Sequence, residues 1–399
     1  MAHRPIYLDC HSTTPLDPQV FEAMVPYFLD YFGNPASVTH QYGWEAEAAV
    51  KRARTQLAEA IHCQPEEIIF TSGATEANNL AIKGVAEAYL GKGRHLITVA
   101  TEHNAVLDPC RYLETLGFEV TVLPVQSDGL LDVAQLEQAI RPDTILVSAM
   151  AANNEIGVLQ PLAAIGALCH DRQVLFHTDA AQAIGKISLD VQAMHIDLMS
   201  LTAHKVYGPK GIGALYVRRR NPRVQLAAQL HGGGHERGLR SGTLYTPQIV
   251  GFAKAVTLAL SQLDSETERI RFLRDRLWQQ ISTALSASSA LPRVYLNGHP
   301  TQRLAGNLNI SIEGVDGQAL LMGLQPIVAV SSGSACTSAK PEPSHVLLAL
   351  GRSPNLAFAS LRFGIGRFNT LEEINQVAEA VITTVRSLHH SASSYGSLG

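Results

Sequence analysis

The chain has 399 residues, of which 46% are hydrophobic and 17% are charged, and its formal net charge is −4. This length suggests two or three domains with a large core. The small negative charge and the lack of a long basic run argue against nucleic acid as the main partner, because phosphate-backbone binding needs clustered Lys and Arg. No run approaches the roughly 20 apolar residues that span a bilayer, so we expect no membrane segment.

The cysteines are scattered along the chain and include no Cys-x-x-Cys pair. Neither a disulfide framework nor a metal site is therefore predicted, and a reducing compartment is favoured. We expect a cytoplasmic protein, although an organellar protein whose transit peptide has been removed would have the same composition. The five cysteines are Cys10, Cys63, Cys110, Cys169 and Cys336.

The first part of the chain, IYLDCHSTTPLDP, indicates a short strand followed by a proline-bounded turn. Apolar residues at helical spacing then predict helices over 17–31 and 43–61. The polar segment GNPASVTHQYG between them is expected to be a loop.

The segment EEIIFTSGATEANNLAIKG predicts a strand that ends at Phe70, a run of small residues, and a helix from Thr75 onward. Small residues let a phosphate approach backbone N–H groups, and the positive end of a helix dipole favours its charge. The segment could therefore bind phosphate. An ordinary helix cap would have the same local pattern.

Apolar runs alternate with helical patterns through the middle of the chain. This alternation predicts a mainly parallel α/β sheet covered by helices on both faces, with ligand-facing loops at the carboxyl ends of the strands. The predicted strands are 67–71, 95–99, 118–123, 144–149, 174–178, 197–201 and 212–217.

Polar residues follow several of these strand ends, which predicts that they share one site. His103 follows the second strand, Asn154 the fourth and Asp179 the fifth. A histidine titrates in the range that suits proton transfer, and an aspartate could pair with a cationic ring nitrogen. Each could instead be structural, His103 as a satisfied polar residue and Asp179 as a turn or cap residue.

Lys205 lies where the strand 197–201 passes into the glycine-rich bend YGPKG. A lysine held against apolar strands tends to lose its proton, and a neutral amine can attack a carbonyl to form a Schiff base. The alternative is a surface lysine, the commoner fate of this residue type.

The segment HGGGHERGLRSGTLYTPQ is too glycine-rich for a helix, and His231 and His235 lack a third metal ligand nearby. After about residue 260 a long charged helix, SETERIRFLRDRLWQQISTAL, precedes short strands at 307–312 and 361–364, which indicates a smaller α+β domain.

Cys336 lies in the pliant segment SSGSACTS, which could carry a thiolate to and from a site. The other four cysteines are expected to be inert packing residues. The final residues, 389–399, are small and polar and are expected to be disordered.

The segment DLMSLTAHKVYGPKGIG resembles the lysine motif of the class-V aminotransferase family, and within it the NifS/IscS-type cysteine desulfurases of the IscS-like group I. YLDCHSTTP, SGATEANN, HGGGHERGLRSGT and SSGSACTS are similar to further motifs of that family, so the resemblance extends from about Tyr7 to Leu388. It implies a homodimer of pyridoxal-phosphate fold type I. The implied domains are a large one over 16–260 and a small one formed by 1–15 and 261–388.

The resemblance also implies which residues contact pyridoxal 5'-phosphate. Lys205 would bind its aldehyde, Asp179 its ring nitrogen and Gln182 its phenolic oxygen, and Thr243 would reach the phosphate in the neighbouring subunit. It places the loop with Asn34 and His40 near the entrance, as weak candidates. The full implied set of cofactor contacts is Lys205, Ala74, Thr75, His103, Asn154, Asp179, Gln182, Thr202, His204 and Thr243.

The implied activity converts L-cysteine to L-alanine and leaves the sulfur as a persulfide on Cys336. Asn154 and Arg362 would anchor the substrate carboxylate, the guanidinium as a bidentate fork. Lys205 would remove the Cα proton and His103 would act as the acid. The sulfur would then pass to an iron–sulfur scaffold or another sulfur-carrier protein.

Two features depart from the family pattern. Thr202-Ala203 replaces a more usual Ser-Gly, and the C-terminal tail does not match the segment with which IscS-type proteins dock their scaffold. Alternative functions are a selenocysteine lyase, a cystine or cysteine β-lyase, or a catalytically silent sulfur-handling partner. A nucleotide-binding Rossmann protein is disfavoured because no G-x-G-x-x-G follows a strand.

Overall fold

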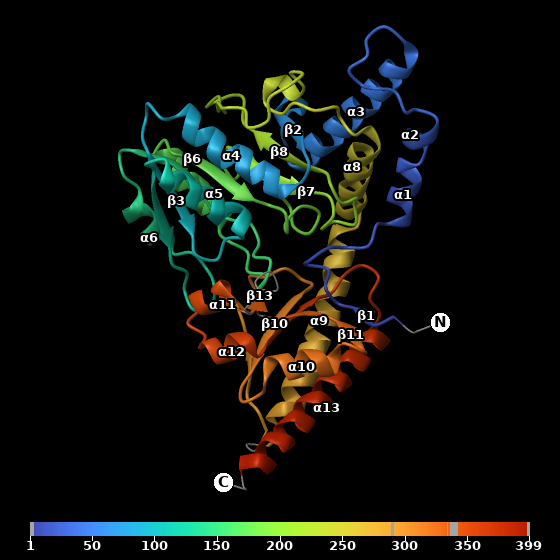
Figure 1. Ribbon diagram of the computed structural model, residues 1–399, viewed down its shortest axis with the longest axis vertical. Coiled ribbons are helices and arrows are strands. Elements are labelled where there is room, and N and C mark those ends of the chain that lie inside the picture. The colour runs from blue at the N-terminus through green and yellow to red at the C-terminus, as the bar shows by residue number, and fades with distance from the viewer. Residues whose placement is uncertain (1–3, 289–290, 333, 336–341, 397–399) are drawn as a thin grey trace.

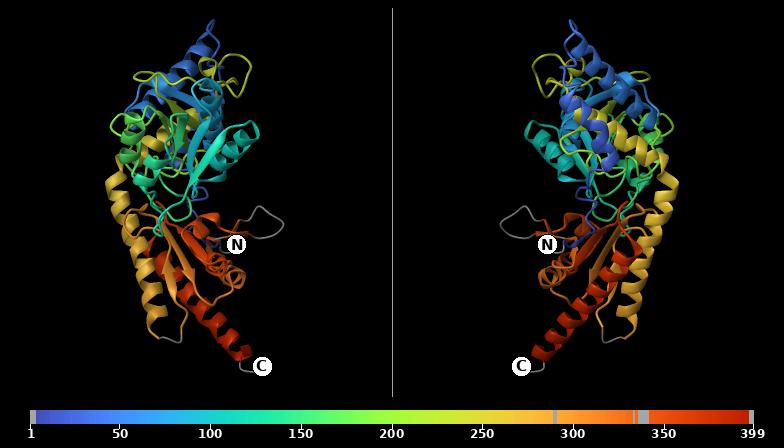
Figure 2. Two further views of the ribbon diagram at one scale, coloured as in Figure 1. Left: turned by 90° about the vertical axis from the view of Figure 1, so that its left-hand side faces the viewer. Right: turned by 90° about the vertical axis from the view of Figure 1, so that its right-hand side faces the viewer.

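The computed structural model describes residues 4–288, 291–332, 334–335 and 342–396. A larger part contains a seven-stranded sheet, and a smaller part contains a four-stranded sheet (Figure 1). The long helix α9 (Leu263–Ser286) begins beside the larger part and continues along one side of the smaller part (Figure 2). Cys336 lies outside the described residues.

The large sheet has the order β2-β8-β7-β6-β5-β3-β4. Its strands are parallel except for β8, which runs antiparallel to both of its neighbours. The prediction of a mainly parallel seven-stranded sheet is therefore confirmed, and the seven expected strands are all present. They are β2 (Ile68–Thr71), β3 (His95–Val99), β4 (Glu119–Leu123), β5 (Thr144–Ser148), β6 (Leu175–Asp179), β7 (Leu198–Thr202) and β8 (Gly213–Val217).

Two hydrophobic clusters cover the two faces of this sheet. Successive strand residues point to opposite faces, so Leu146 packs with one cluster and Val147 with the other. Helices α4 and α5 join the first cluster, and α3, α7 and α8 join the second. The helices of this part are α1 (Pro18–Met24), α2 (Pro26–Leu29), α3 (Gln41–Ala60), α4 (Ala74–Ala88), α5 (Asn104–Thr115), α6 (Val133–Ala139), α7 (Leu162–Asp171) and α8 (Thr246–Ser261), with the short 3₁₀ turns η1 (Pro65–Glu67) and η2 (Glu236–Gly238).

The helix predicted over 17–31 is divided in two. Helix α1 ends before Val25, and α2 starts at Pro26. Proline has no N–H to continue the helical hydrogen bonds, and its ring clashes with the preceding turn, so the chain restarts a helix there.

The smaller part is built on the sheet β12-β15-β10-β9. β1, near the N-terminus, pairs in parallel with β11, and Leu8 joins the hydrophobic core of this part. Its strands are β1 (Ile6–Tyr7), β9 (Val294–Leu296), β10 (Asn307–Ile312), β11 (Val328–Ala329), β12 (Ser331–Ser332), β13 (Ser334–Ala335), β14 (Glu342–Pro343) and β15 (Ser360–Gly364). Its helices, besides α9, are α10 (Gly317–Leu324), α11 (His345–Ala349), α12 (Pro354–Phe358) and α13 (Leu371–Gly396).

The C-terminal end departs from expectation. Helix α13 continues to Gly396, so the prediction of a disordered segment is wrong for residues 389–396. Extending an existing helix adds one hydrogen bond for each residue fixed, whereas starting a helix is costly, so polar residues can prolong a stable helix. Residues 397–399 lie outside the described part. Over the described residues, no helix is both long and apolar enough to cross a membrane.

Candidate active site

A cavity of about 540 Å³ opens at the carboxyl ends of the large sheet. The loops after β2, β3, β5, β6 and β7 all reach it, as the strand-end pattern predicts. It brings together nine of the twelve predicted site residues, namely Ala74, Thr75, His103, Asn154, Asp179, Gln182, Thr202, His204 and Lys205.

The amino end of α4 forms one wall of the cavity. Its N-cap is Gly73, and no described side chain caps the helix at this residue. The first N–H groups of a helix have no partner within the helix and carry a partial positive charge. The close packing requires glycine, because a Cβ on Gly213 of β8 would lie 2.7 Å from the Cα of Gly73. This end of α4 can therefore receive a phosphate.

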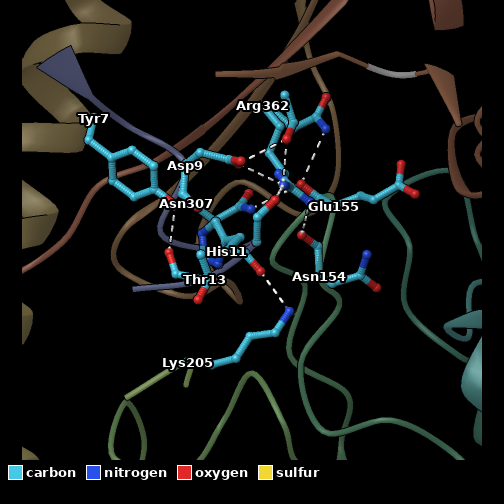
Figure 3. A network of polar contacts seen from close by, with 12 residues as sticks. Tyr7, Asp9, His11, Thr13, Asn154, Glu155, Lys205, Asn307 and Arg362 are labelled. Carbon is cyan, nitrogen blue, oxygen red and sulfur yellow. Dashed lines mark hydrogen bonds and ion pairs between the residues drawn. The ribbon is translucent and has the colours of Figure 1, made fainter. Parts of the chain in front are cut away.

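Lys205 reaches the cavity from the turn after β7 (Figure 3). Its Nζ donates a 2.7 Å hydrogen bond to the backbone oxygen of His11. Burial, with a smaller contribution from the charge of Arg362, lowers the pKa of Lys205 from its usual 10.5 to about 8, although Asp179 and Asp9 oppose the shift. A larger fraction of this amine is therefore neutral, and so nucleophilic, near pH 7 than for an exposed lysine.

Asp179 ends β6 and faces the same cavity. Its Oδ2 accepts a 2.7 Å hydrogen bond from Asn78 Nδ2, and its Oδ1 accepts one of 2.9 Å from the backbone N–H of Ala181. Each oxygen retains further acceptor capacity. The carboxylate is therefore fixed in place and can still accept a hydrogen bond from a protonated nitrogen of a ligand.

His103 is the N-cap of α5, and its Nδ1 accepts a 3.0 Å hydrogen bond from the N–H of Ala105. The neutral ring therefore carries its proton on Nε2. Burial lowers the pKa of His103, and the charge of Lys205 acts in the same direction, although Asp179 and Glu155 oppose it. This arrangement favours a neutral hydrogen-bond donor, because protonation at Nδ1 would break the cap.

His204 and Thr202 flank the lysine turn. The Nδ1 of His204 lies 3.1 Å from Thr13 Oγ1, and the Oγ1 of Thr202 lies 3.5 Å from the backbone oxygen of Ile212. Burial lowers the pKa of His204 to about 4, and the charges of nearby lysines add to the effect. His204 therefore lines the cavity with a neutral imidazole ring at physiological pH.

Arg362 lies on β15 of the smaller part and reaches the loop after β5 (Figure 3). Its Nη1 donates to the backbone oxygen of Asn154 at 3.1 Å, and its Nη2 donates at 2.7 Å to Asp9, at 2.8 Å to Ser12 and at 2.7 Å to Ser331. These contacts place a guanidinium beside the cavity, where it can bind a carboxylate. The buried Oδ1 of Asn154 accepts no hydrogen bond from a described residue.

Other predicted residues do not line this cavity. Thr243 is exposed. His40 caps α3, its Nδ1 accepting from Gly43 N–H, and Asn34 Oδ1 accepts from the N–H of Ala36, so both have local structural roles. His235 Nδ1 accepts from a backbone N–H in its own loop.

Sequence reasoning missed the residues that hold the predicted ones in place. His11 and Asp9 lie in the DCHSTTP motif, whose polar character was the available signal. Asn78 and Lys186 had no local signal, because Asn78 meets Asp179 across 101 residues and Lys186 meets Gln182 within a non-helical turn.

The cavity fits pyridoxal phosphate on the evidence of its own residues. An uncapped helix end can hold the phosphate, and a carboxylate fixed by two donors can pair with a ring nitrogen. A lysine with a lowered pKa can bind an aldehyde.

Comparisons with known proteins agree with this site. The family model "Aminotransferase class-V" matches residues 6–377. "Cysteine desulfurase IscS" of Tolumonas auensis is 59% identical over 93% of this chain and 90% of its own, and "Cysteine desulfurase" of Mus musculus is 56% identical over 96% and 82%.

Two solved structures are similar throughout. The structure titled "NIFS-LIKE PROTEIN" has a TM-score of 0.87 at 34% identity and covers 96% of this chain and 100% of its own. The structure titled "SspA in complex with cysteine" has a TM-score of 0.80 at 38% identity and covers 92% and 100%. With this cavity and a family match over most of its length, the chain belongs to the class-V aminotransferase family.

Proposed function

We propose that this protein is a pyridoxal-phosphate-dependent cysteine desulfurase that converts L-cysteine to L-alanine and retains the sulfur as a persulfide. The observation that carries the proposal is the buried Lys205 amine, which shares one cavity with Asp179 and the uncapped end of α4. Relatives that are 55–59% identical bear the name cysteine desulfurase, and one similar solved structure is titled as a complex with cysteine.

The proposal assigns each cofactor contact to a residue of this cavity. When bound, pyridoxal phosphate supplies an aldehyde for an amine to attack and a ring that stabilises negative charge at the substrate Cα. Lys205 binds the aldehyde, and the N–H groups around Ala74 and Thr75 bind the phosphate. Thr202 and His204 line the cavity beside Lys205, and Asp179 pairs with the ring nitrogen.

Substrate binding and proton transfer are assigned to four residues. Arg362 and Asn154 hold the carboxylate of L-cysteine, which orients its Cα toward the Lys205 amine. Lys205, released from the aldehyde when the substrate amine replaces it, removes the Cα proton in its neutral form. His103 donates a hydrogen bond from Nε2, and the acid role that the resemblance implies would require it to give up the bond from Ala105 N–H.

Cys336 is the proposed sulfur acceptor, on the basis of its sequence motif. Its thiolate attacks the substrate sulfur, the carbon–sulfur bond breaks, and the electron pair of that bond remains on the carbon that becomes the methyl group of alanine. The terminal sulfur of the persulfide is electrophilic, so a thiolate of an iron–sulfur scaffold or a sulfur-carrier protein can accept it.

A Cys336→Ala variant tests this function against the β-lyase alternative. After incubation with L-cysteine, the wild type is expected to yield equal amounts of alanine and protein-bound persulfide, with mass spectrometry locating the sulfur on Cys336. The variant should lose persulfide formation and nearly all alanine production. Pyruvate and sulfide from the variant at the wild-type rate would instead identify a β-lyase.

We further propose a homodimer. Eight large hydrophobic side chains between residues 21 and 44 are at least 43% exposed, and Tyr245 extends the same surface through an edge contact with Phe28. Apolar surface of this extent indicates a protein interface. The exposed residues are Phe21, Phe28, Leu29, Tyr31, Phe32, Val38, Tyr42 and Trp44. In the dimer, Thr243 of one subunit would reach the phosphate of the other.

Replacing Phe32 and Val38 by Glu is expected to convert the dimer to monomers. These side chains are 64% and 76% exposed, and burying two carboxylates in an apolar interface costs several kcal/mol. Light scattering after size exclusion would measure the mass. A wild type that is monomeric at micromolar concentration would contradict the proposal.

A further inference from the structure

A second lysine lies behind the cavity. The Nζ of Lys186, just after Gly185, donates a 3.2 Å hydrogen bond to the Oε1 of Gln182. Gln182 lines the site cavity, whereas Lys186 lines a separate small cavity of about 50 Å³ between the two parts of the molecule. Lys186 therefore touches the site through Gln182.

Gln182 links Lys186 to the environment of Lys205. Its Nε2 donates a 2.8 Å hydrogen bond to the backbone oxygen of His11, the same oxygen that accepts from Lys205 Nζ. The Nδ1 of His11 lies 3.2 Å from the Oε1 of Gln182. Because the His11 carbonyl can only accept, the Nε2 of Gln182 must face it, which leaves the Oε1 to accept from Lys186. The second N–H of Gln182 Nε2 remains available to an acceptor in the site.

The site also acts on the charge of Lys186. Burial, with smaller contributions from the charges of Lys205 and Arg362, lowers the pKa of Lys186 to about 7, while Cys10 opposes the shift. Because Lys186 has the lower pKa of the two lysines, it loses its proton first, and its charge is not among the causes of the lowered pKa of Lys205. The charged or titratable groups around Lys186 are Lys205, Arg362, Cys10, His11, Tyr207 and Glu266, and Glu266 is itself paired with Arg367.

We propose that Lys186 is a positioning residue of the active site, which orients the amide of Gln182. The Gln182 amide then presents a donor to an anionic oxygen of the ligand. This inference rests on the proposed function, because its readout uses the bound cofactor.

The test titrates the absorbance bands of the bound cofactor with pH. In Lys186→Met holoenzyme the midpoint is expected to rise by on the order of one pH unit relative to the wild type, because an anionic oxygen of the cofactor that loses its donor from Gln182 attracts the proton of the Lys205 nitrogen more strongly. Lys186→Arg can still donate to the Oε1 of Gln182 and should restore most of the wild-type midpoint. Lys92→Met removes an exposed lysine beyond the far end of α4 and is the matched control.

A double-mutant cycle separates positioning from general damage. Lys186→Met is expected to weaken cofactor binding roughly tenfold in the wild-type background, since it removes the partly buried hydrogen bond that orients Gln182. In a Gln182→Ala background the same change should have little further effect on affinity, because the amide that it orients is gone. Thermal unfolding of every variant shows which of them remain folded.

Each outcome has one meaning. An unchanged midpoint in a folded Lys186→Met protein, or additive losses of affinity in the cycle, overturns the inference that Lys186 orients Gln182. A wild type whose Lys205 carries no cofactor contradicts the proposed function instead. Borohydride reduction of the wild type and peptide mapping distinguish that failure from the other two.

Discussion

Lys205→Ala is expected to abolish covalent cofactor attachment and to reduce alanine formation from L-cysteine by roughly 10⁴-fold or more, since both the nucleophile and the base are lost. In the wild type, Lys205 is the amine in the cavity whose pKa burial lowers to about 8. The wild-type holoenzyme should be yellow, and borohydride should fix a pyridoxyl group on Lys205. The variant should bind the cofactor only reversibly, and dialysis should remove it.

Lys210→Met is a matched control for this experiment. Lys210 also lines the cavity, but its side chain is exposed, so it lacks the burial that distinguishes the Lys205 amine. The label should stay on the peptide that contains Lys205 when Lys210 is replaced. A pyridoxyl group that moves to another lysine, or is missing from the wild type, would contradict the assignment of Lys205 as the attachment point.

The strands, the helices and the shared position of the site residues could be predicted, because local sequence patterns determine them. Each strand of the large sheet is a short apolar run bounded by turn residues, which is a local pattern. The rule that ligands meet the carboxyl ends of parallel strands then predicted that His103, Asn154, Asp179 and Lys205 share one cavity. The division of the first helix at Pro26 could also have been read locally, because proline interrupts helical hydrogen bonding.

Features that depend on tertiary contacts could not be predicted from the sequence alone. His11 meets Gln182 across 171 residues, and Asn78 meets Asp179 across 101. Local patterns do not identify such partners, which depend on how the elements pack. The contact of Lys186 with Gln182 is of the same kind, because its segment, AIGKIS, contains no local signal for a lysine that packs behind the site.

The contacts of Arg362 show how a residue can be predicted correctly while its surroundings are not. The sequence predicted that Arg362 lies on a strand over 361–364, and the resemblance implied that it binds the substrate carboxylate. The structure adds that its guanidinium already has an acidic partner, because Nη2 lies 2.7 Å from Asp9 Oδ1. This ion pair joins the N-terminal segment to β15 and orients the guanidinium before substrate binds.

Arg362→Ala is expected to reduce kcat/KM for L-cysteine by roughly 100- to 1000-fold, mainly through a higher KM. The estimate follows from the loss of one or two charge-assisted hydrogen bonds of about 1.5–3 kcal/mol each. Arg362→Lys keeps the charge but loses the planar fork, so we expect a smaller loss, of roughly tenfold. Steady-state kinetics with L-cysteine measures both.

The same substitution also removes a partly buried ion pair, and this second effect must be separated from substrate binding. With the guanidinium gone, Asp9 retains only the hydroxyl of Ser331 as a side-chain donor among the described residues, so the protein is expected to lose stability.

Asp9→Asn is the matched control, because it breaks the ion pair but keeps the guanidinium. We expect Asp9→Asn to lower the unfolding temperature while kcat/KM falls less than about tenfold, since the guanidinium keeps its bonds to Ser12, Ser331 and the Asn154 backbone. If Asp9→Asn raised KM as much as Arg362→Ala does, substrate binding would depend on the ion pair that orients the guanidinium. An unchanged KM in Arg362→Ala would show that the carboxylate is held elsewhere.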